Sequence, residues 1–82
     1  MSCNVEILNE AKLNKGEGWY LCFQYCKYVY DRDSVNGEYG YRFIWRRPDG
    51  TLQPARGQAR IPRMTDIMYL TSTAILEGWG EE

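Results

Sequence analysis

The residues best suited to chemistry in this sequence are the arginines between positions 42 and 63. Six arginines fall in this stretch together with a single acid, Asp49. An arginine guanidinium is planar and always charged, and it donates hydrogen bonds in a fork that matches phosphate or carboxylate. Trp45 lies among them, and many proteins hold single-stranded bases with arginine beside aromatic rings. The pattern predicts a binding surface made of Arg42, Trp45, Arg46, Arg47, Arg56, Arg60 and Arg63.

These arginines also have a structural explanation. Arginines on adjacent strands often pair across a sheet or with nearby acids, and Asp31, Asp33, Glu77 and the acidic C-terminal tail are available. The net charge of −1 counts against a polyanionic partner, because non-specific affinity for nucleic acid is mostly phosphate electrostatics. Three interpretations stay open: an internally paired surface, a surface for a protein partner or a second copy, and a surface for single-stranded nucleic acid.

The residues that catalysis usually needs are missing or scattered. The sequence contains no histidine, which removes the commonest general base, the commonest zinc ligand and every Ser-His or Cys-His arrangement. No glycine-rich phosphate loop is present. The acids Glu6, Glu10, Glu17 and Glu38 show no spacing that would pair two of them in a cleft. We therefore expect a protein that is not an enzyme and holds no cofactor.

The three cysteines, Cys3, Cys22 and Cys26, show no CxxC spacing. On a strand, Cys22 and Cys26 would share a face but lie about 13 Å apart, which is too far for a disulfide. Without histidine they also make a poor zinc site. The pattern predicts reduced thiols with a packing role and no bound metal. Together with the lack of a signal-peptide pattern or a membrane-spanning apolar run, it predicts a cytoplasmic protein without membrane contact.

Chain length limits the elements that can position these side chains. Residues 1–82 are enough for one domain, whose core must be small because a chain this short buries only about 60% of its unfolded surface. Seven Tyr, three Trp and two Phe raise the apolar area that each buried residue can contribute.

The N-terminal half predicts strands. Residues 4–14 alternate apolar and polar side chains, which favours a strand, although Glu, Leu, Ala and Lys would also suit a helix and Leu8 fits the alternation poorly. Two glycines in residues 15–18 predict a tight turn. Residues 19–30 form the main predicted strand, with Trp19, Leu21, Phe23, Tyr25 and Val29 on the face expected to meet the core.

Residues 39–47 are the next predicted strand, and its register is open. Asn36-Gly37 predicts a two-residue hairpin turn, which would pair Val29 with Ile44. A loop one residue longer would pair Val29 with Phe43, and such a slip exchanges the two faces.

The C-terminal half begins with a turn at Pro48-Asp49-Gly50, followed by a weak edge strand over residues 51–61. A helix then starts after Pro62, capped by Thr65, with Met64 and Tyr69 as a hydrophobic staple and Gly78 as its left-handed terminator. The stripe expected to face the sheet is Ile67, Leu70, Thr71, Ala74, Ile75 and Gly78. Tyr69 and Leu76 are expected on the outer side.

These elements predict a small α+β fold: an antiparallel β-meander of three to four strands with one C-terminal helix packed on a face. If residues 4–14 were helical, the order would be αβββα. Double-stranded-RNA-binding domains share that order, but they begin the last helix with a lysine-rich cluster, where this chain reads PRMTDIM. The similarity is one of element order and carries no functional motif. The sequence therefore favours a non-catalytic protein that binds another protein, with nucleic-acid binding as the alternative.

Overall fold

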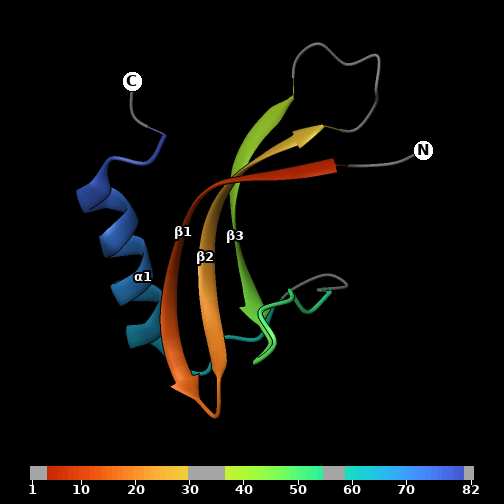
Figure 1. Cartoon of the computed structure of the whole chain (residues 1–82). Coiled ribbons are helices and arrows are strands. Elements are labelled where there is room, and N and C mark those ends of the chain that lie inside the picture. The colour runs from red at the N-terminus through yellow and green to blue at the C-terminus, as the bar shows by residue number, and fades with distance from the viewer. Residues whose placement is uncertain (1–3, 30–36, 55–58, 81–82) are drawn as a thin grey trace.

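A computed structural model, which describes residues 4–29, 37–54 and 59–80, shows a three-stranded antiparallel meander with one C-terminal helix (Figure 1). The strands are β1 (Asn4–Gly16), β2 (Trp19–Val29) and β3 (Glu38–Arg46), and they lie in the order β1-β2-β3. The helix is α1 (Met64–Glu77). The predicted α+β class and element order are confirmed. Within the described residues, no helix is long and apolar enough to cross a membrane.

Residues 4–16 form a strand, as the alternation favoured, but the strand is bulged. The pairing with β2 shifts between Ile7 and Asn9, which leaves Leu8 as an extra residue. Val5 and Ile7 therefore share a face with Tyr28 and Cys26, whereas residues after the bulge change face relative to the simple alternation. Leu8 fits the strand pattern poorly because it occupies this bulge.

The turn between β1 and β2 confirms the role expected for its glycines. Gly16, Glu17 and Gly18 have φ values of 101°, 55° and 85°, in the left-handed region that glycine adopts at little cost. A Cβ on Gly18 would also lie 2.9 Å from the Cβ of Pro48. The end of the first hairpin therefore packs directly against the turn that follows β3.

The register of β2 against β3 differs from both predicted pairings. Phe23 lies opposite Phe43 and Tyr28 opposite Glu38, so neither the Val29–Ile44 nor the Val29–Phe43 pairing forms. The described pairing ends at Tyr28 and Glu38, and the connection is therefore far longer than a two-residue turn. Asn36 of the predicted turn lies outside the described residues.

After β3 the chain turns as predicted, but the described residues of the expected strand do not form one. The Gly50 N–H donates to the Arg47 carbonyl (2.8 Å), and the Arg47 N–H donates to the Thr51 carbonyl (2.8 Å). Beyond this turn, the described residues show only a bridge between Arg46 and Leu52 and a bond from the Gln53 N–H to the Trp45 carbonyl. Over residues 51–54 and 59–61 the predicted edge strand is thus reduced to a short contact, which is consistent with Pro54 removing a ladder donor, and residues 55–58 of the prediction lie outside the described residues.

The helix begins earlier than predicted. Arg63 is the N-cap and has no side-chain capping bond, so the predictions of Thr65 as the cap and of a Met64–Tyr69 staple are wrong. Asp66 lies in the first turn, as expected, and is buried, and its carboxylate accepts a 2.9 Å hydrogen bond from Lys15 Nζ that offsets the cost of burying the charge. This ion pair joins the start of α1 to the end of β1.

The C-terminal end of α1 is built as predicted. Gly78 is left-handed with φ 75°, and the Trp79 N–H donates to the Ala74 carbonyl at 3.1 Å. This bond is the long-range bond of a Schellman cap. It turns Trp79 back over the helix, where its side chain is 6% exposed.

The core lies between α1 and the sheet face that carries the odd-numbered residues of β2. Leu21 and Phe23 meet Leu70, Ala74 and Trp79 there. Phe23 stacks on Trp79 with ring centroids 5.9 Å apart, and Phe43 packs beside it at 4.7 Å. The predicted core face of β2 is confirmed for its central residues.

The predicted helix stripe is only partly correct. Leu70 and Ala74 are buried, but Ile75 is 76% exposed. The helix packs over β1 and β2 and does not extend to β3, so the side of α1 that carries Ile75 has no strand beneath it. Tyr69 and Leu76 are exposed, as expected.

Leu70→Ala is expected to lower the free energy of unfolding by about 2–5 kcal/mol, because it removes a fully buried side chain from the small core. Leu76→Ala is the matched control on the same helix, and since Leu76 is 86% exposed it should change stability by less than about 0.5 kcal/mol. Urea unfolding followed by circular dichroism measures both. Equal losses would show that α1 does not pack through Leu70.

Candidate functional site

The structure divides the predicted arginine and tryptophan surface between the two faces of the sheet. Side chains alternate along a strand, so Arg42 and Arg46 lie on the face away from α1. Trp45 lies on the α1 face, packed against the core and edge-to-face with Trp19 at 6.4 Å. The predicted residues therefore do not form one continuous patch on β3.

On the face away from α1, a hydrogen-bonded polar network crosses all three strands. Gln24 Nε2 donates to Glu10 Oε2 (2.8 Å), and Arg42 Nε donates to Gln24 Oε1 (2.8 Å). Arg46 also donates to Glu10 Oε2, through Nη2 at 2.7 Å and Nε at 3.3 Å. We call Glu10, Gln24, Arg42 and Arg46 the polar network. Gln24 at its centre has no exposed surface.

Electrostatics holds Glu10 ionised within this network. Burial alone would raise the pKa of the Glu10 carboxyl, but hydrogen bonds from Arg46 and Gln24 outweigh it, and the pKa is lowered. The same bond raises the pKa of Arg46. Arg46 is therefore engaged with an acid on β1 that the sequence did not identify as its partner.

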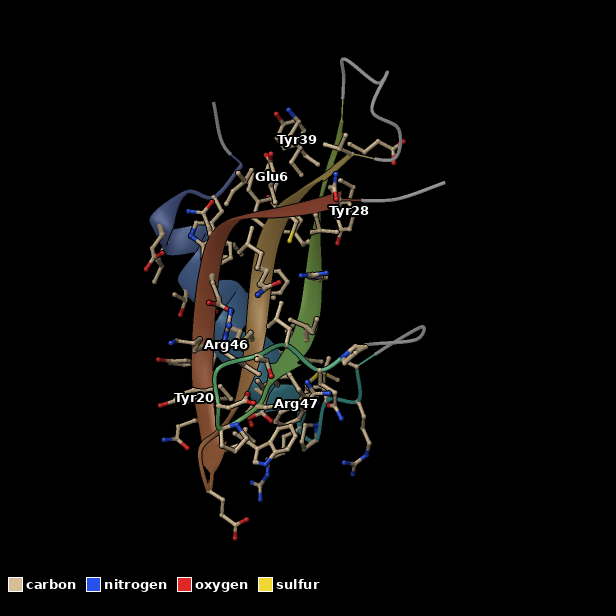
Figure 2. All side chains as sticks on the ribbon, turned by 45° about the vertical axis from the view of Figure 1, so that its right-hand side comes forward. Glu6, Tyr20, Tyr28, Tyr39, Arg46 and Arg47 are labelled. Carbon is tan, nitrogen blue, oxygen red and sulfur yellow. The ribbon has the colours of Figure 1, made fainter. Side chains whose placement is uncertain are left out.

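The remaining predicted arginines lie near the end of β3 and before α1. Arg47 Nη1 donates to the Thr51 hydroxyl and to the Leu52 carbonyl, both at 3.3 Å, and so supports the turn. Figure 2 shows Arg46 and Arg47 in the lower part of the sheet, far from Tyr39. Arg60 and Arg63 are exposed, and the Arg60 carbonyl accepts a 2.9 Å hydrogen bond from Trp45 Nε1. Arg56 lies outside the described residues.

A pocket of about 330 Å³ opens on the other face, between α1 and β3. Its lining residues are Phe23, Tyr41, Thr71, Ala74, Ile75 and Trp79. The Tyr41 hydroxyl donates to the Trp79 carbonyl at 3.2 Å and so ties the end of the chain to β3. The Thr71 hydroxyl and the Trp79 indole N–H are also polar but are bonded within the chain, and the other lining side chains are apolar. The pocket is therefore suited to apolar side chains rather than to ions.

Exposed apolar side chains extend this pocket along both elements. Tyr39 and Tyr41 of β3 are 57% and 51% exposed. Met64, Met68, Thr71 and Ile75 follow the i, i+4, i+7, i+11 spacing that places residues on one side of a helix, and the pocket shows that this side adjoins Tyr41. We call the pocket with Tyr39, Met64 and Met68 the α1–β3 groove.

Sequence patterns alone do not predict this groove, although one signal for it is present. The spacing of Met64, Met68 and Ile75 defines an apolar stripe beside the stripe of Leu70 and Ala74. The helix thus carries more apolar surface than its contact with the sheet needs. Which apolar side chains of the helix stay exposed depends on the strands that α1 covers, and tertiary packing decides this.

The thiols of Cys22 and Cys26 are free and fully buried beside the polar network. Burial raises the pKa of Cys22 to about 11, with a further contribution from the Glu10 carboxylate. Burial also raises the pKa of Cys26. Among the described residues, no group of three or more His, Cys, Asp or Glu side chains is arranged to hold a metal ion.

A scan against protein-family models, a search of curated proteins and a search of solved structures each found no match to this chain.

Glu10→Gln is expected to lower the free energy of unfolding by about 1–2 kcal/mol at neutral pH, because it removes the charge that Arg46 meets. The Glu10 pKa is lower in the folded chain than its unfolded value of about 4.3. The stabilisation by the Glu10 charge is therefore fully present when the pH is above the unfolded pKa. It is lost as the pH falls through the folded pKa. The difference between the wild type and the variant should shrink in acid, measured by urea unfolding between about pH 3 and 7.

Glu6→Gln, on the exposed part of the same strand, is the control and should change stability little at any pH. A difference between the wild type and Glu10→Gln that stayed constant on acidification would contradict the role given to the Glu10 charge.

Alkylation tests the thiols. In a Cys3→Ser variant, iodoacetamide at neutral pH should modify Cys22 and Cys26 only after unfolding in urea, since the thiolate is the nucleophile and both thiols are buried. Mass spectrometry of the native and the unfolded protein measures the modification. Native-state modification at the rate of a free peptide thiol would show a reactive site on this face.

Proposed function

We propose that this protein is a non-catalytic interaction domain that binds an apolar segment of another polypeptide in the α1–β3 groove. The observation that carries the proposal is the exposure of large apolar side chains on both sides of one pocket. Ile75 on the helix and Tyr41 on the strand line the pocket and are 76% and 51% exposed. Met68 is 60% exposed and lies one turn before Thr71 on the same side of α1. Contiguous exposed apolar surface of this kind is typical of protein-binding sites.

The composition of the groove supports a polypeptide partner over a small polar ligand. Tyrosine and methionine are enriched in protein interfaces, and methionine adapts its shape to a partner. The polar atoms in the pocket are already engaged, because the Tyr41 hydroxyl donates to Trp79 and the Thr71 hydroxyl donates to Ile67. Affinity would then come from burying apolar area.

Nucleic-acid binding has weaker support. Arg46 is paired with Glu10, and Arg42 and Arg47 make bonds within the chain, so phosphate contacts would compete with these bonds. The aromatic side chains of the groove are also on the opposite face from Arg42 and Arg46. A phosphate-binding surface needs several cations beside its stacking rings, and on the groove face Lys27, whose Nζ lies 5.9 Å from the Tyr39 ring centroid, supplies one.

Photocrosslinking tests the proposal. A benzophenone amino acid replaces Ile75 in one variant and Leu76 in the other, and both are irradiated in an extract of the source cells. The two positions are neighbours on α1 with similar exposure, 76% and 86%, but only Ile75 lines the pocket. Polypeptide adducts are expected at least several-fold more often at position 75, measured by mass spectrometry.

Equal adduct yields at the two positions would contradict binding in the α1–β3 groove. Adducts at position 75 that lose mass on nuclease treatment would favour the nucleic-acid alternative instead.

A further inference from the structure

Most of the outer edge of β3 carries no partner strand among the described residues. In the described residues, the chain covers this edge only at its lower end, where Leu52 bridges Arg46 and Gln53 bonds to the Trp45 carbonyl. Because the Trp45 carbonyl points away from β2, the alternating pattern of an antiparallel ladder directs the backbone groups of Tyr39, Tyr41 and Phe43 outward too. Figure 2 shows Tyr39 at the end of the sheet away from Arg46 and Arg47.

The other edge of the sheet carries features that disfavour pairing. β1 has register shifts at Leu8 and near Lys15, and bulges twist an edge away from incoming strands. It also carries exposed Glu6 and Lys12, and charge on an edge opposes association. β3 pairs with β2 without a register shift, and it has aromatic side chains along one face.

We propose that two copies of this chain associate through their β3 edges, antiparallel, about a twofold axis at Gly40. This inference goes beyond the proposed function, because it uses the backbone edge of β3 and not the α1–β3 groove, although Tyr39 and Tyr41 belong to both.

Charge and backbone geometry select this register. With Gly40 opposite Gly40 of the second copy, Glu38 lies opposite Arg42 and Tyr39 lies opposite Tyr41. Each Tyr39–Tyr41 pair exchanges two backbone hydrogen bonds through outward groups, and each Glu38–Arg42 pair falls at a closely spaced position. Opposite charges there attract, and facing aromatic rings add packing.

Neighbouring registers lack this complementarity. An axis at Arg42 would place two guanidinium groups directly opposite each other, and like charges across a ladder repel. An axis at Tyr41 would place Glu38 opposite the apolar Ile44. The Arg42 guanidinium has five N–H donors, and its Nε bond to Gln24 leaves donors for a second acceptor.

The resulting dimer has a continuous six-stranded sheet, because each copy contributes β1-β2-β3. A twofold axis perpendicular to the sheet keeps both α1 helices on the same face. Since each helix covers β1 and β2 and not β3, the two helices flank a trough floored by Tyr39 and Tyr41 of both copies. Pairing thus removes the exposed edge and doubles the aromatic surface.

Sedimentation equilibrium from about 1 µM to 1 mM tests the dimer, with circular dichroism as the check on folding. The wild type should pass from 9.6 kDa to twice that mass as concentration rises. Glu38→Arg should weaken association about tenfold, because the twofold axis repeats every unfavourable pair. Arg42→Glu should weaken it similarly, and since it also removes the bond to Gln24, its free energy of unfolding is measured alongside. The double variant Glu38→Arg/Arg42→Glu restores opposite charges and should return to within about threefold of the wild type.

A proline variant tests the backbone. Tyr39→Pro removes an N–H that points away from β2, so the fold should persist while association is lost. Tyr39→Ala, which keeps the N–H, should still associate.

A monomer at every concentration would overturn the inference, as would association that is indifferent to both the charge reversals and the proline. Photoadducts to a different polypeptide at position 75 would leave the proposed function standing in that case. A dimer without such adducts would leave only the dimer.

Discussion

The constraint on which this structure depends is one of width. An α-helix with its side chains is about 10–12 Å across, whereas three strands spaced about 4.8 Å apart present a broader surface with two faces. One helix can cover only part of one face. Residues 4–29 and 37–54, which precede α1 in the described part of the chain, contain no second helix. The apolar surface of the sheet that α1 does not reach must be covered by other side chains or stay exposed.

The two faces solve this problem differently. Away from α1, long polar side chains cover the sheet, and Glu10, Arg42 and Arg46 enclose the buried amide of Gln24. Charged side chains can shield apolar surface along their stems while their ends stay near water. On the α1 face, aromatic rings continue from the core onto β3, where the helix does not reach. Side chains of the chain itself cover the face away from α1, whereas the aromatic rings of β3 on the α1 face stay exposed.

Local chemistry predicted much of the fold. The turn at Pro48-Asp49-Gly50, the left-handed Gly78 and the aromatic strand of β2 depend on backbone preference and side-chain alternation, which the sequence contains directly. The register of β3 depends on where a long connection closes, and two residues of hairpin signal could not specify it. The position of α1 over β1 and β2 likewise follows from tertiary packing, so the exposure of Ile75 was not predictable.

The candidate site was harder to predict for the same reason. Arg46 is adjacent to Trp45 in sequence, yet the pleat places them on opposite faces, and Glu10 reaches Arg46 from 36 residues away. Clustered arginines can be recognised directly in a sequence. An apolar helix stripe that does not pack in the core can be recognised only once the packing of the core is known.

The contact between the first turn and Pro48 has a consequence for how this sequence can change. Gly18 has positive φ, and its missing side chain leaves the space that the proline ring occupies. A larger residue at position 18 would therefore need both a new turn conformation and a smaller residue at position 48. In any set of related sequences, these two positions should vary together, and a glycine lost at one should coincide with a proline lost at the other.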